Sequence, residues 1–211
     1  MACLIVFNDS GFPEGSVHYR GVAREPLSRA THRASATRLL LEAFIAARYA
    51  AAYGARVEHF CPHLVGLPAA SGNAWRAGVG YTPAAASELY LEHYLDRPIE
   101  AAIAGATGSV VAREDVVEVG NLASASPGAA REIIVAMRAH LARAGFTWVT
   151  FTATRELRNS FARLGLRLVD LGRADPARLP DGGAAWGRYY AHDPVVVAGA
   201  LRAGVVHAAV A

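Results

Sequence analysis

The spacing of apolar residues along the chain predicts a series of helices and strands. Between Ser35 and Tyr53 apolar residues recur every three or four positions and Gly54 follows, which predicts a helix ending at a glycine. Apolar and polar residues alternate over Trp75–Tyr81, which predicts a strand, and Gly66–Gly72 before it is expected to be a loop. By the same reasoning we expect further strands at Cys3–Phe7, Ala55–His63, Asp115–Asn121, Phe146–Thr152, Leu166–Leu171 and Trp186–Tyr190, and further helices over Ala84–Tyr94, Ile99–Ala104, Ser126–Ala144 and Arg155–Leu164.

The centre of the chain predicts a strand, a loop of small residues and a helix start. Ser126 is a favourable N-cap and Pro127 suits the first helical position, so Leu122–Ser126 is expected to be the loop. A helix N-terminus has unpaired N–H groups and a partial positive charge, and the small residues Ser124–Ala130 would let a phosphate approach it. A plain connection between a strand and a helix uses the same residues, so both interpretations stay open here.

Composition narrows the class of protein. Hydrophobic residues make up 53% of the 211 residues and charged residues 18%, which is typical of a folded chain. All 21 basic residues are arginine, so chemistry that needs a lysine amine, such as a Schiff base, is excluded. Two cysteines are too few for a disulfide scaffold and favour a reducing, cytoplasmic compartment. We therefore expect one α/β domain over residues 1–211.

The net charge of +3 is partly clustered near the N-terminus. An arginine-rich arm is expected over residues 1–34, and with the start of the next helix it carries Arg20, Arg24, Arg29, Arg33 and Arg38. Such a cluster would meet an acidic partner, such as a phosphate, an acyl-carrier protein or an anionic membrane. The alternative is an ordinary solvated surface. We expect no nucleic-acid partner.

We do not expect the two apolar stretches at the ends of the sequence to be targeting or membrane segments. The start of the chain lacks the basic region of a secretory signal. The stretch from Pro194 is strongly apolar, but Arg202 and His207 interrupt it. We expect residues 194–211 to form a core-packing or interface helix.

The strongest candidate for chemistry is Glu118. It sits in the middle of a strand among Val116, Val117 and Val119, and a carboxylate there is costly unless it is paired or used. It would act as a general base on an amine or hydroxyl acceptor, or else form an ion pair with an arginine. Asn121 at the end of this strand would orient a carbonyl or make turn hydrogen bonds.

For the other candidate residues, ordinary packing is the alternative to a functional role. His59, Cys61 and His63 would share one strand face, but a fourth ligand is not evident, so no metal site is expected. Trp148 is a core residue or a wall of an acyl tunnel. Arg188 would hold a substrate carboxylate.

Several stretches resemble the bacterial thermostable hemolysin family. They are GVGYTPA (78–84), LYLEHYLDRPIE (89–100), VVEVGNLAS (116–124), FTATRELRNSFARLGL (151–166) and WGRYY (186–190). That family is related to the GCN5-related N-acetyltransferase superfamily and resembles its acyl-homoserine-lactone synthases. The resemblance implies a mixed central sheet with splayed parallel strands flanked by helices, and an acyl-thioester arm between the strands at 115–121 and 146–152.

The resemblance itself points to Glu118 alone, and the other members of the candidate site come from the residues. The catalytic candidates are Glu118 and Asn121. The thioester arm would be bound by Leu122, Ala123, Ser124, Ser126, Gly128, Ala129, Ala130 and Thr152, and the substrate by Trp148, Arg188 and Tyr190. The expected co-substrate is acyl-CoA or a phosphopantetheine-linked acyl thioester.

The chain departs from the acetyltransferase pattern at two places. The usual Arg or Gln followed by Gly-x-Gly is replaced by the small residues 123–129. Where many acetyltransferases place a proton-donating Tyr, this chain has Phe161, so the donor would be Tyr189, Tyr190, Ser124 or Thr152. We expect an acyltransferase acting on a small acceptor, with an acidic acyl-carrier protein as donor or partner. The alternatives are a membrane-active hemolysin and a non-catalytic acyl-binding module.

Overall fold

The computed structural model describes residues 5–7, 27–70, 74–163 and 165–201, with side chains of the first long helix from Ala36 onward. Within these residues seven strands follow the hydrogen-bonded order β1-β2-β3-β4-β5-β7-β6. They are β1 (Ile5–Phe7), β2 (His63–Pro68), β3 (Trp75–Pro83), β4 (Val116–Ser124), β5 (Trp148–Ala153), β6 (Val169–Arg173) and β7 (Val195–Ala200). The helices are α1 (Leu27–Tyr53), α2 (Ile99–Thr107), α3 (Pro127–Arg143) and α4 (Arg155–Arg163), with short 3-10 helices at η1 (Tyr90–Tyr94), η2 (Arg113–Asp115), η3 (Pro176–Arg178), η4 (Ala184–Trp186) and η5 (Tyr189–His192).

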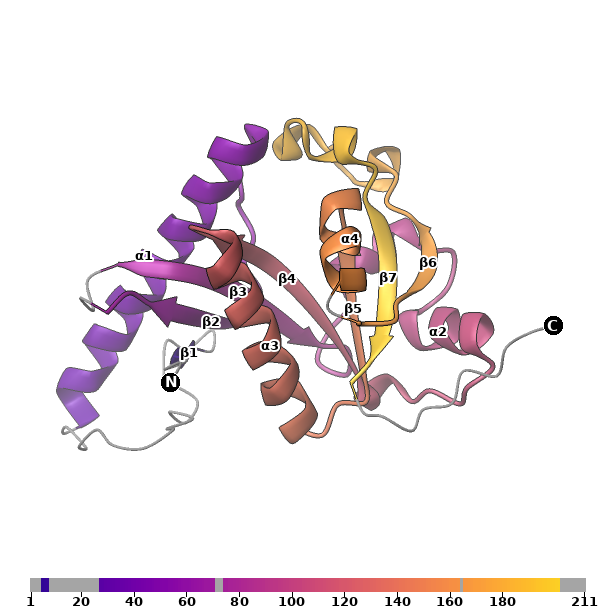
Figure 1. The fold of residues 1–211 in the computed structure, drawn as a ribbon, viewed down its shortest axis with the longest axis horizontal. Helices are drawn as coiled ribbons and strands as arrows, with labels where there is room; N and C mark the ends of the chain where they lie inside the picture. The colour runs from indigo at the N-terminus through magenta and orange to yellow at the C-terminus, as the bar shows by residue number, and fades with distance from the viewer. Residues whose placement is uncertain (1–4, 8–26, 71–73, 164, 202–211) are drawn as a thin grey trace. The chain divides into compact units, whose positions relative to one another are not determined.

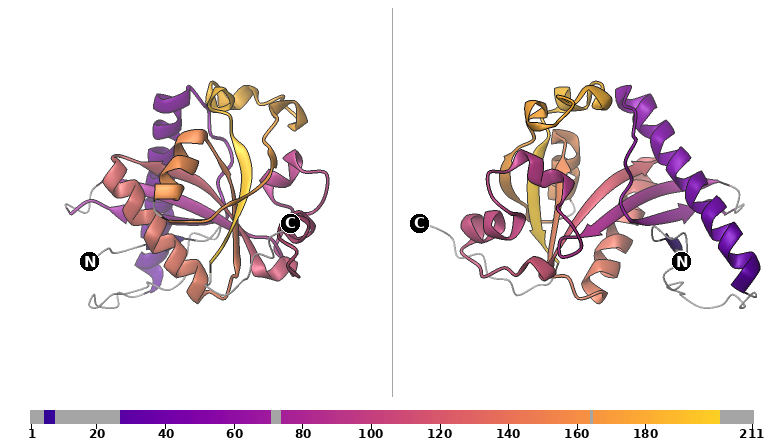
Figure 2. Two further views of the ribbon diagram at one scale, coloured as in Figure 1. Left: turned by 45° about the vertical axis from the view of Figure 1, so that its right-hand side comes forward. Right: turned by 180° about the vertical axis from the view of Figure 1, so that it is seen from behind.

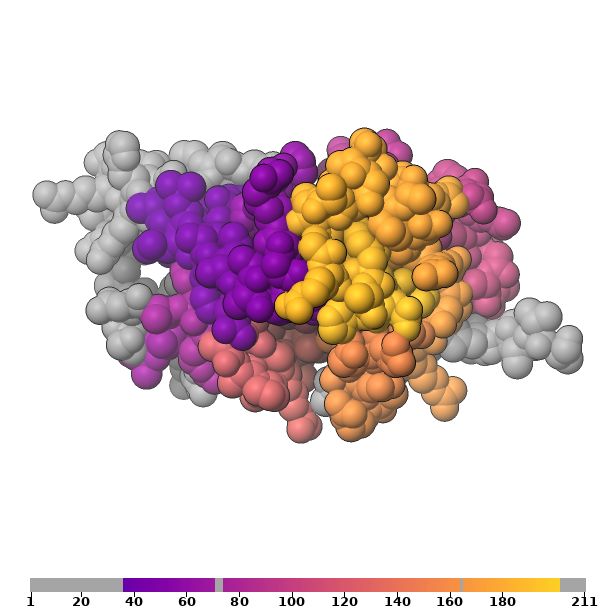
Figure 3. All heavy atoms as spheres, turned by 90° about the horizontal axis from the view of Figure 1, so that it is seen from above, coloured from indigo at the N-terminus to yellow at the C-terminus, as the bar shows by residue number. Residues whose placement is uncertain are grey.

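The chain forms two compact units that share β4. The first contains β1, β2, β3, the carboxyl half of β4 and most of α3, together with α1. Its strands β1, β2 and β3 pair antiparallel. In Figures 1 and 2, α1 and α3 lie on opposite sides of β2 and β3. Leu39 and Leu40 of α1 are exposed. The described part of α1 is the indigo segment in Figure 3.

The second unit contains the amino half of β4 with β5, β7 and β6. The start of β4 pairs parallel with β5, at Val116–Glu118 with Trp148–Thr150, whereas β5 and β6 each pair antiparallel with β7. The mixed sheet flanked by helices is therefore confirmed. The divergence of β4 and β5 toward their carboxyl ends stays a prediction, as does the single domain.

Each face of β5 packs against a different helix within the second unit. Trp148 is buried in a core with Ile99 and Ile103 of α2, whereas the ring of Phe151 lies 5.0 Å from that of Phe161 of α4. Side chains alternate along a strand, so Trp148 and Phe151 point to opposite faces. Figure 1 shows α4 lying along β5.

The first helix is longer than predicted. It begins at Leu27 instead of Ser35, so residues 27–34 of the expected arginine-rich arm are helical. The residues after Pro26 are mostly good helix formers, which allows the helix to extend toward the N-terminus. Arg29 and Arg33 lie in this helix, and Arg20 and Arg24 lie outside the described residues. The predicted end is confirmed, because Gly54 takes a left-handed φ of +68°.

The predicted strand over Ala55–His63 is wrong, because β2 begins only at His63. Side chains bind the preceding backbone in place of a strand partner: the Arg38 guanidinium donates to the carbonyls of Cys61 and Pro62. The predicted loop Gly66–Gly72 is wrong over Gly66–Pro68, which lie in β2. A Cβ on Gly66 would lie 2.3 Å from the ring of Trp75, so this glycine makes room for an aromatic ring and does not form a turn.

Three further predictions are corrected. Residues 84–94 form turns and the short η1 instead of one helix, and Leu122–Ser124 extend β4 instead of forming a loop. Trp186–Tyr190 is not a strand but spans η4 and η5, because Gly183 and Gly187 take φ of +78° and +53°, which an extended strand does not allow. The predicted C-terminal helix is a strand over Val195–Ala200, and residues 202–211 lie outside the described part.

The central helix start agrees with its prediction. Ser126 caps α3, since its hydroxyl accepts from the Ala129 N–H at 3.3 Å, and Pro127 is the first helical residue. The helix ends before Gly145, whose φ is +102°.

Candidate functional site

Glu118 is a buried acid on β4, opposite Thr150 of β5 in the parallel register. Its side chain is 8% exposed, and its Oε2 accepts the Tyr90 N–H at 2.9 Å. Burial raises the pKa of Glu118 to about 7; the N–H groups of Tyr90 and Leu91 work against this rise, and the charge of Glu92 adds to it. A carboxyl group with a pKa near neutrality can both take and give a proton at physiological pH. The ion pair with an arginine that sequence reasoning left open is not found among the described residues.

Aromatic side chains gather around Tyr90, whose N–H binds Glu118. The indole Nε1 of Trp186 donates to the Tyr90 hydroxyl at 2.9 Å, and the hydroxyls of Tyr94 and Tyr190 are 2.7 Å apart. Burial raises the pKa of Tyr190 to about 12 and also raises the pKa values of Tyr90 and Tyr94. These phenols therefore stay protonated at neutral pH and can act as hydrogen-bond donors. The structure places the predicted substrate residue Tyr190 in this cluster.

Tyr189 continues the cluster toward the end of β5. Its hydroxyl donates to the Thr152 carbonyl at 3.3 Å, and its ring meets those of Tyr53 and Trp186 at centroid distances of 5.3 and 5.4 Å. Among the four donors proposed from sequence, Tyr189 is thus joined directly to Thr152, a predicted thioester-binding residue.

Trp148 and Arg188 differ in their surroundings. Trp148 is 2% exposed, and the core to which it belongs also contains Tyr94 and packs against Trp186 and Tyr190, so its part in an acyl tunnel stays a prediction. The Arg188 side chain is exposed, while its backbone N–H donates to the Tyr53 carbonyl at 2.8 Å.

The start of α3, in the other unit, carries the predicted thioester-binding residues. Ala123 and Ala129 are buried, whereas Ser126 and Gly128 are exposed and a Cβ on Gly128 would meet open space. The remaining members of the set, Leu122, Ser124 and Ala130, are partly buried. Small exposed residues at a positively polarised helix end permit close approach of an anion.

Asn121 interrupts β4 in a left-handed conformation, with φ of +52°. Its Oδ1 accepts the Cys61 N–H at 2.8 Å and its Nδ2 donates to the His59 carbonyl at 3.4 Å. These contacts join β4 to the segment before β2 and are not the turn hydrogen bonds that were the alternative, and the catalytic role of Asn121 stays a prediction.

The His59-x-Cys61-x-His63 motif is used in packing. The Cys61 sulfur lies against Gly80 and Gly120, and the His63 ring stacks on that of Tyr81 at 4.5 Å. Within the described residues no group of three His, Cys, Asp or Glu side chains is arranged to hold a metal.

Glu92 and Arg113 form an ion pair that sequence reasoning missed. The Glu92 side chain is 8% exposed, and two nitrogens of Arg113 donate to its two oxygens at 2.7 and 2.8 Å. Hydrogen bonds from Arg113 and from the N–H groups of Leu89 and Ile99 outweigh burial and lower the pKa of Glu92 to about 2. The signal in the sequence is an acid inside the mostly apolar stretch LYLEHYL, which a helical pattern alone places in solvent.

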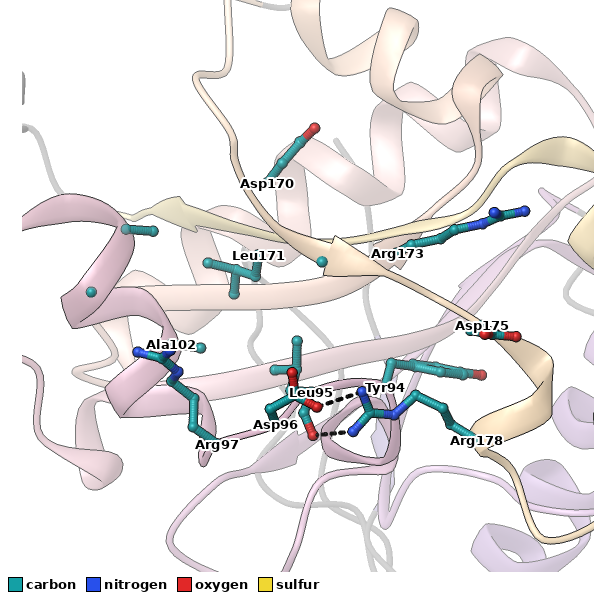
Figure 4. A pocket seen from close by; sticks show the side chains of 13 residues that line it. Tyr94, Leu95, Asp96, Arg97, Ala102, Asp170, Leu171, Arg173, Asp175 and Arg178 are labelled. Atoms are coloured by element: carbon teal, nitrogen blue, oxygen red, sulfur yellow. Dashed lines mark hydrogen bonds and ion pairs between the residues drawn. The ribbon is translucent and has the colours of Figure 1, made fainter.

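A groove of about 550 Å³ lies in the second unit between the residues after η1, α2 and β6 (Figure 4). Its acids are already engaged: Asp96 pairs with Arg178 at 2.7 Å, Asp170 pairs with Arg158 at 3.5 Å, and Asp175 accepts from a backbone N–H. None of the residues predicted from sequence to form the site lines this groove. Glu118 and its aromatic neighbours are therefore the stronger candidate.

The model of the thermostable hemolysin family matches residues 31–205 of the chain. The chain belongs to the thermostable hemolysin family. No curated protein matches the sequence.

Solved structures share the fold of this family member at low sequence identity. TofI, in a ternary complex with an inhibitor and MTA, gives a TM-score of 0.54 at 14% identity over 95% of this chain and 92% of its own. The CoA-dependent acyl-homoserine lactone synthase BjaI, solved with SAM and isopentyl-CoA, gives 0.53 at 12% identity over 97% and 86%. FeeM, an N-acyl amino acid synthase from uncultured soil microbes, gives 0.52 at 15% identity over 78% and 90%. These likenesses establish the fold.

Among the described residues, no helix is both long enough and apolar enough to cross a membrane.

Proposed function

We propose that this protein is an acyltransferase that moves an acyl group from a CoA or acyl-carrier-protein thioester to an amine or hydroxyl of a small acceptor. The observation that carries the proposal is the buried Glu118, whose pKa of about 7 suits a general base at physiological pH. The shared fold with BjaI and FeeM supports it, because BjaI is a CoA-dependent acyl-homoserine lactone synthase and FeeM is an N-acyl amino acid synthase.

In the proposed reaction the acceptor nitrogen or oxygen attacks the thioester carbonyl carbon. A C–N or C–O bond forms as the C–S bond breaks, and the Glu118 carboxylate takes the acceptor proton. The sulfur leaves as a thiolate and takes a proton from water or from the Tyr189 hydroxyl, which lies at the Thr152 carbonyl. Tyr190 and Arg188 would contact the acceptor, with Arg188 pairing a carboxylate on it.

The thioester arm would be held by residues 122–130 at the start of α3, together with Thr152. The phosphates of CoA or phosphopantetheine are anions, and the positive end of a 17-residue helix attracts them. We assign Asn121 the role of holding the 59–61 backbone beside this segment, because its amide bonds both Cys61 and His59. An acidic acyl-carrier protein would find complementary charge in the basic chain, whose net charge is +3.

The test is incubation of the full-length protein with mixed acyl-CoA and acyl-carrier donors and amine or hydroxyl acceptors, with thiol release and acylated products followed by mass spectrometry. We expect Glu118→Gln to lower transfer by about 100-fold or more, the usual contribution of a general base. The matched control is Glu100→Gln, since Glu100 is a carboxylate of the same unit that binds Arg113. A Glu118→Gln protein with full activity, or absence of transfer with every donor, would refute the proposal.

The family description favours a second candidate, a protein that damages membranes. Dye leakage from liposomes of anionic and neutral lipid, with purified protein and no thioester, tests it. Leakage that Glu118→Gln leaves unchanged, in a protein without transfer activity, would favour this alternative.

A further inference from the structure

The backbone that hydrogen-bonds Glu118 is itself held by one carboxylate, that of Glu92. Its Oε2 accepts the N–H of Leu89, directly before η1, and its Oε1 accepts the N–H of Ile99, the first residue of α2, both at 2.8 Å. Between these two points lies η1, whose Tyr90 N–H donates to Glu118. Glu92 therefore fixes both ends of the segment that reaches Glu118.

Arg113 binds Glu92 through a guanidinium group whose N–H donors all have acceptors. Its Nη1 donates to Glu92 and Glu100 at 2.7 and 2.9 Å, its Nη2 to Glu92 and the Ser87 carbonyl at 2.8 and 3.1 Å, and its Nε to the Ala84 carbonyl at 2.9 Å. An arginine has five N–H donors, so every one has an acceptor here. The rigid fork permits the bidentate contact with Glu92 that a lysine cannot make.

The same arginine ties this segment to the strand that carries Glu118. Arg113 lies in η2, which leads directly into β4 at Val116. The Ala84 N–H donates to the Val116 carbonyl at 3.0 Å, while the Ala84 carbonyl accepts from Arg113. The segment before η1 is therefore anchored to β4, the strand whose Glu118 carboxylate accepts an N–H of η1.

We propose that Glu92, locked by Arg113, is a positioning residue for Glu118, presenting the N–H groups of Tyr90 and Leu91 to its carboxylate. The inference rests on the proposed function only where it predicts activity, because the positioning itself can be measured without turnover. Both donors stabilise the ionised form of Glu118, so their loss would make its proton harder to remove.

Several groups face Glu118 or act on its neighbours. From η1 these are Tyr90 and the ionised Glu92, and from β5 the register partner is the neutral Thr150. Asp181 acts on Tyr90 and Tyr190. Because the charge of Glu92 itself raises the pKa of Glu118, a test of positioning must keep that charge in place.

The experiment therefore uses charge-preserving variants of the full chain. The side-chain carboxyl of Glu118 is titrated by carbon-13 NMR in protein labelled at glutamate, and its signal is assigned by its absence in Glu118→Gln. In Glu92→Asp the shorter acid keeps its charge but cannot reach both N–H groups, and in Arg113→Lys the charge stays while the fork is lost. Glu100→Asp is the matched control, since Glu100 binds the same guanidinium.

We expect the Glu118 midpoint to rise by about 1 pH unit or more in Glu92→Asp and Arg113→Lys and to stay unchanged in Glu100→Asp. Circular dichroism shows whether each variant folds. If either Glu92→Asp or Arg113→Lys does not fold, the midpoint is measured in the one that does. A midpoint that stays fixed or falls in a folded variant overturns the inference.

Activity supplies the second arm. A general base works as the carboxylate, so the pH below which kcat/KM falls should move upward together with the NMR midpoint. If the wild-type protein transfers no acyl group, the proposed function fails while the midpoint still decides the positioning role. If transfer occurs and neither the midpoint nor the pH profile moves, the positioning role fails alone.

Discussion

Replacing Glu118 with glutamine should change how protein stability depends on pH. The pKa of Glu118 is raised to about 7 from an ordinary value of 4.5. That difference corresponds to about 3 kcal/mol at about 1.36 kcal/mol per pH unit, and the ionised form of the folded protein bears this cost.

The sign follows from proton binding. Between pH 4.5 and about 7 the folded protein keeps the Glu118 proton that the unfolded chain has lost. The free energy of unfolding therefore falls as pH rises through this window, and below it the two states bind this proton equally. A neutral glutamine does not titrate, and its side-chain oxygen can still accept the Tyr90 N–H.

The assay is urea unfolding of wild type and Glu118→Gln across this pH range. The variant's stability relative to wild type should increase by about 3 kcal/mol from the acid end to the alkaline end. Other titrating groups cancel in the difference, and Glu92, whose pKa is about 2, titrates below the window. A difference that stays flat, or that changes in favour of wild type at high pH, would show that Glu118 does not have a raised pKa.

Two further predictions concern the free energy of unfolding. Trp148→Ala should lower the free energy of unfolding by about 3–5 kcal/mol because Trp148 is fully packed in the core, whereas Arg188→Ala at an exposed site should change it by about 0.5 kcal/mol at most, both measured by urea unfolding. Ser126→Ala removes the cap of α3 and should cost about 1 kcal/mol in the same assay, while Ser126→Gly should cost less; equal stability of all three proteins would show that the cap is not used.

The general plan of the fold could be predicted from sequence because local signals agree with the packing. Ser126 and Pro127 mark the start of α3, and Gly145 marks its end. One prediction fails because both faces of the element are buried. The Val195–Val197 run is such a case, since a buried strand and an apolar helix look alike without alternation, and here the residues lie between β5 and β6.

The site could be predicted in part. Glu118 is visible as a lone carboxylate among valines, and the structure confirms that it is buried. Its partners could not be found, because Tyr90 reaches it through a backbone N–H, and the sequence does not show where a main-chain group points. Glu92 was missed for a related reason, since an acid that caps two segments has the same pattern as a solvated one.

The shared strand β4 has a consequence for how this gene can vary. Val116 belongs to the core of one unit and Ala123 to that of the other, with Glu118 between them. Deleting a single codon within β4 would turn the side chains beyond it to the wrong face, and one of the two cores would lose its residues. Insertions should therefore be tolerated in the surface turns but not in this strand, and neither unit can be inherited as a separate module.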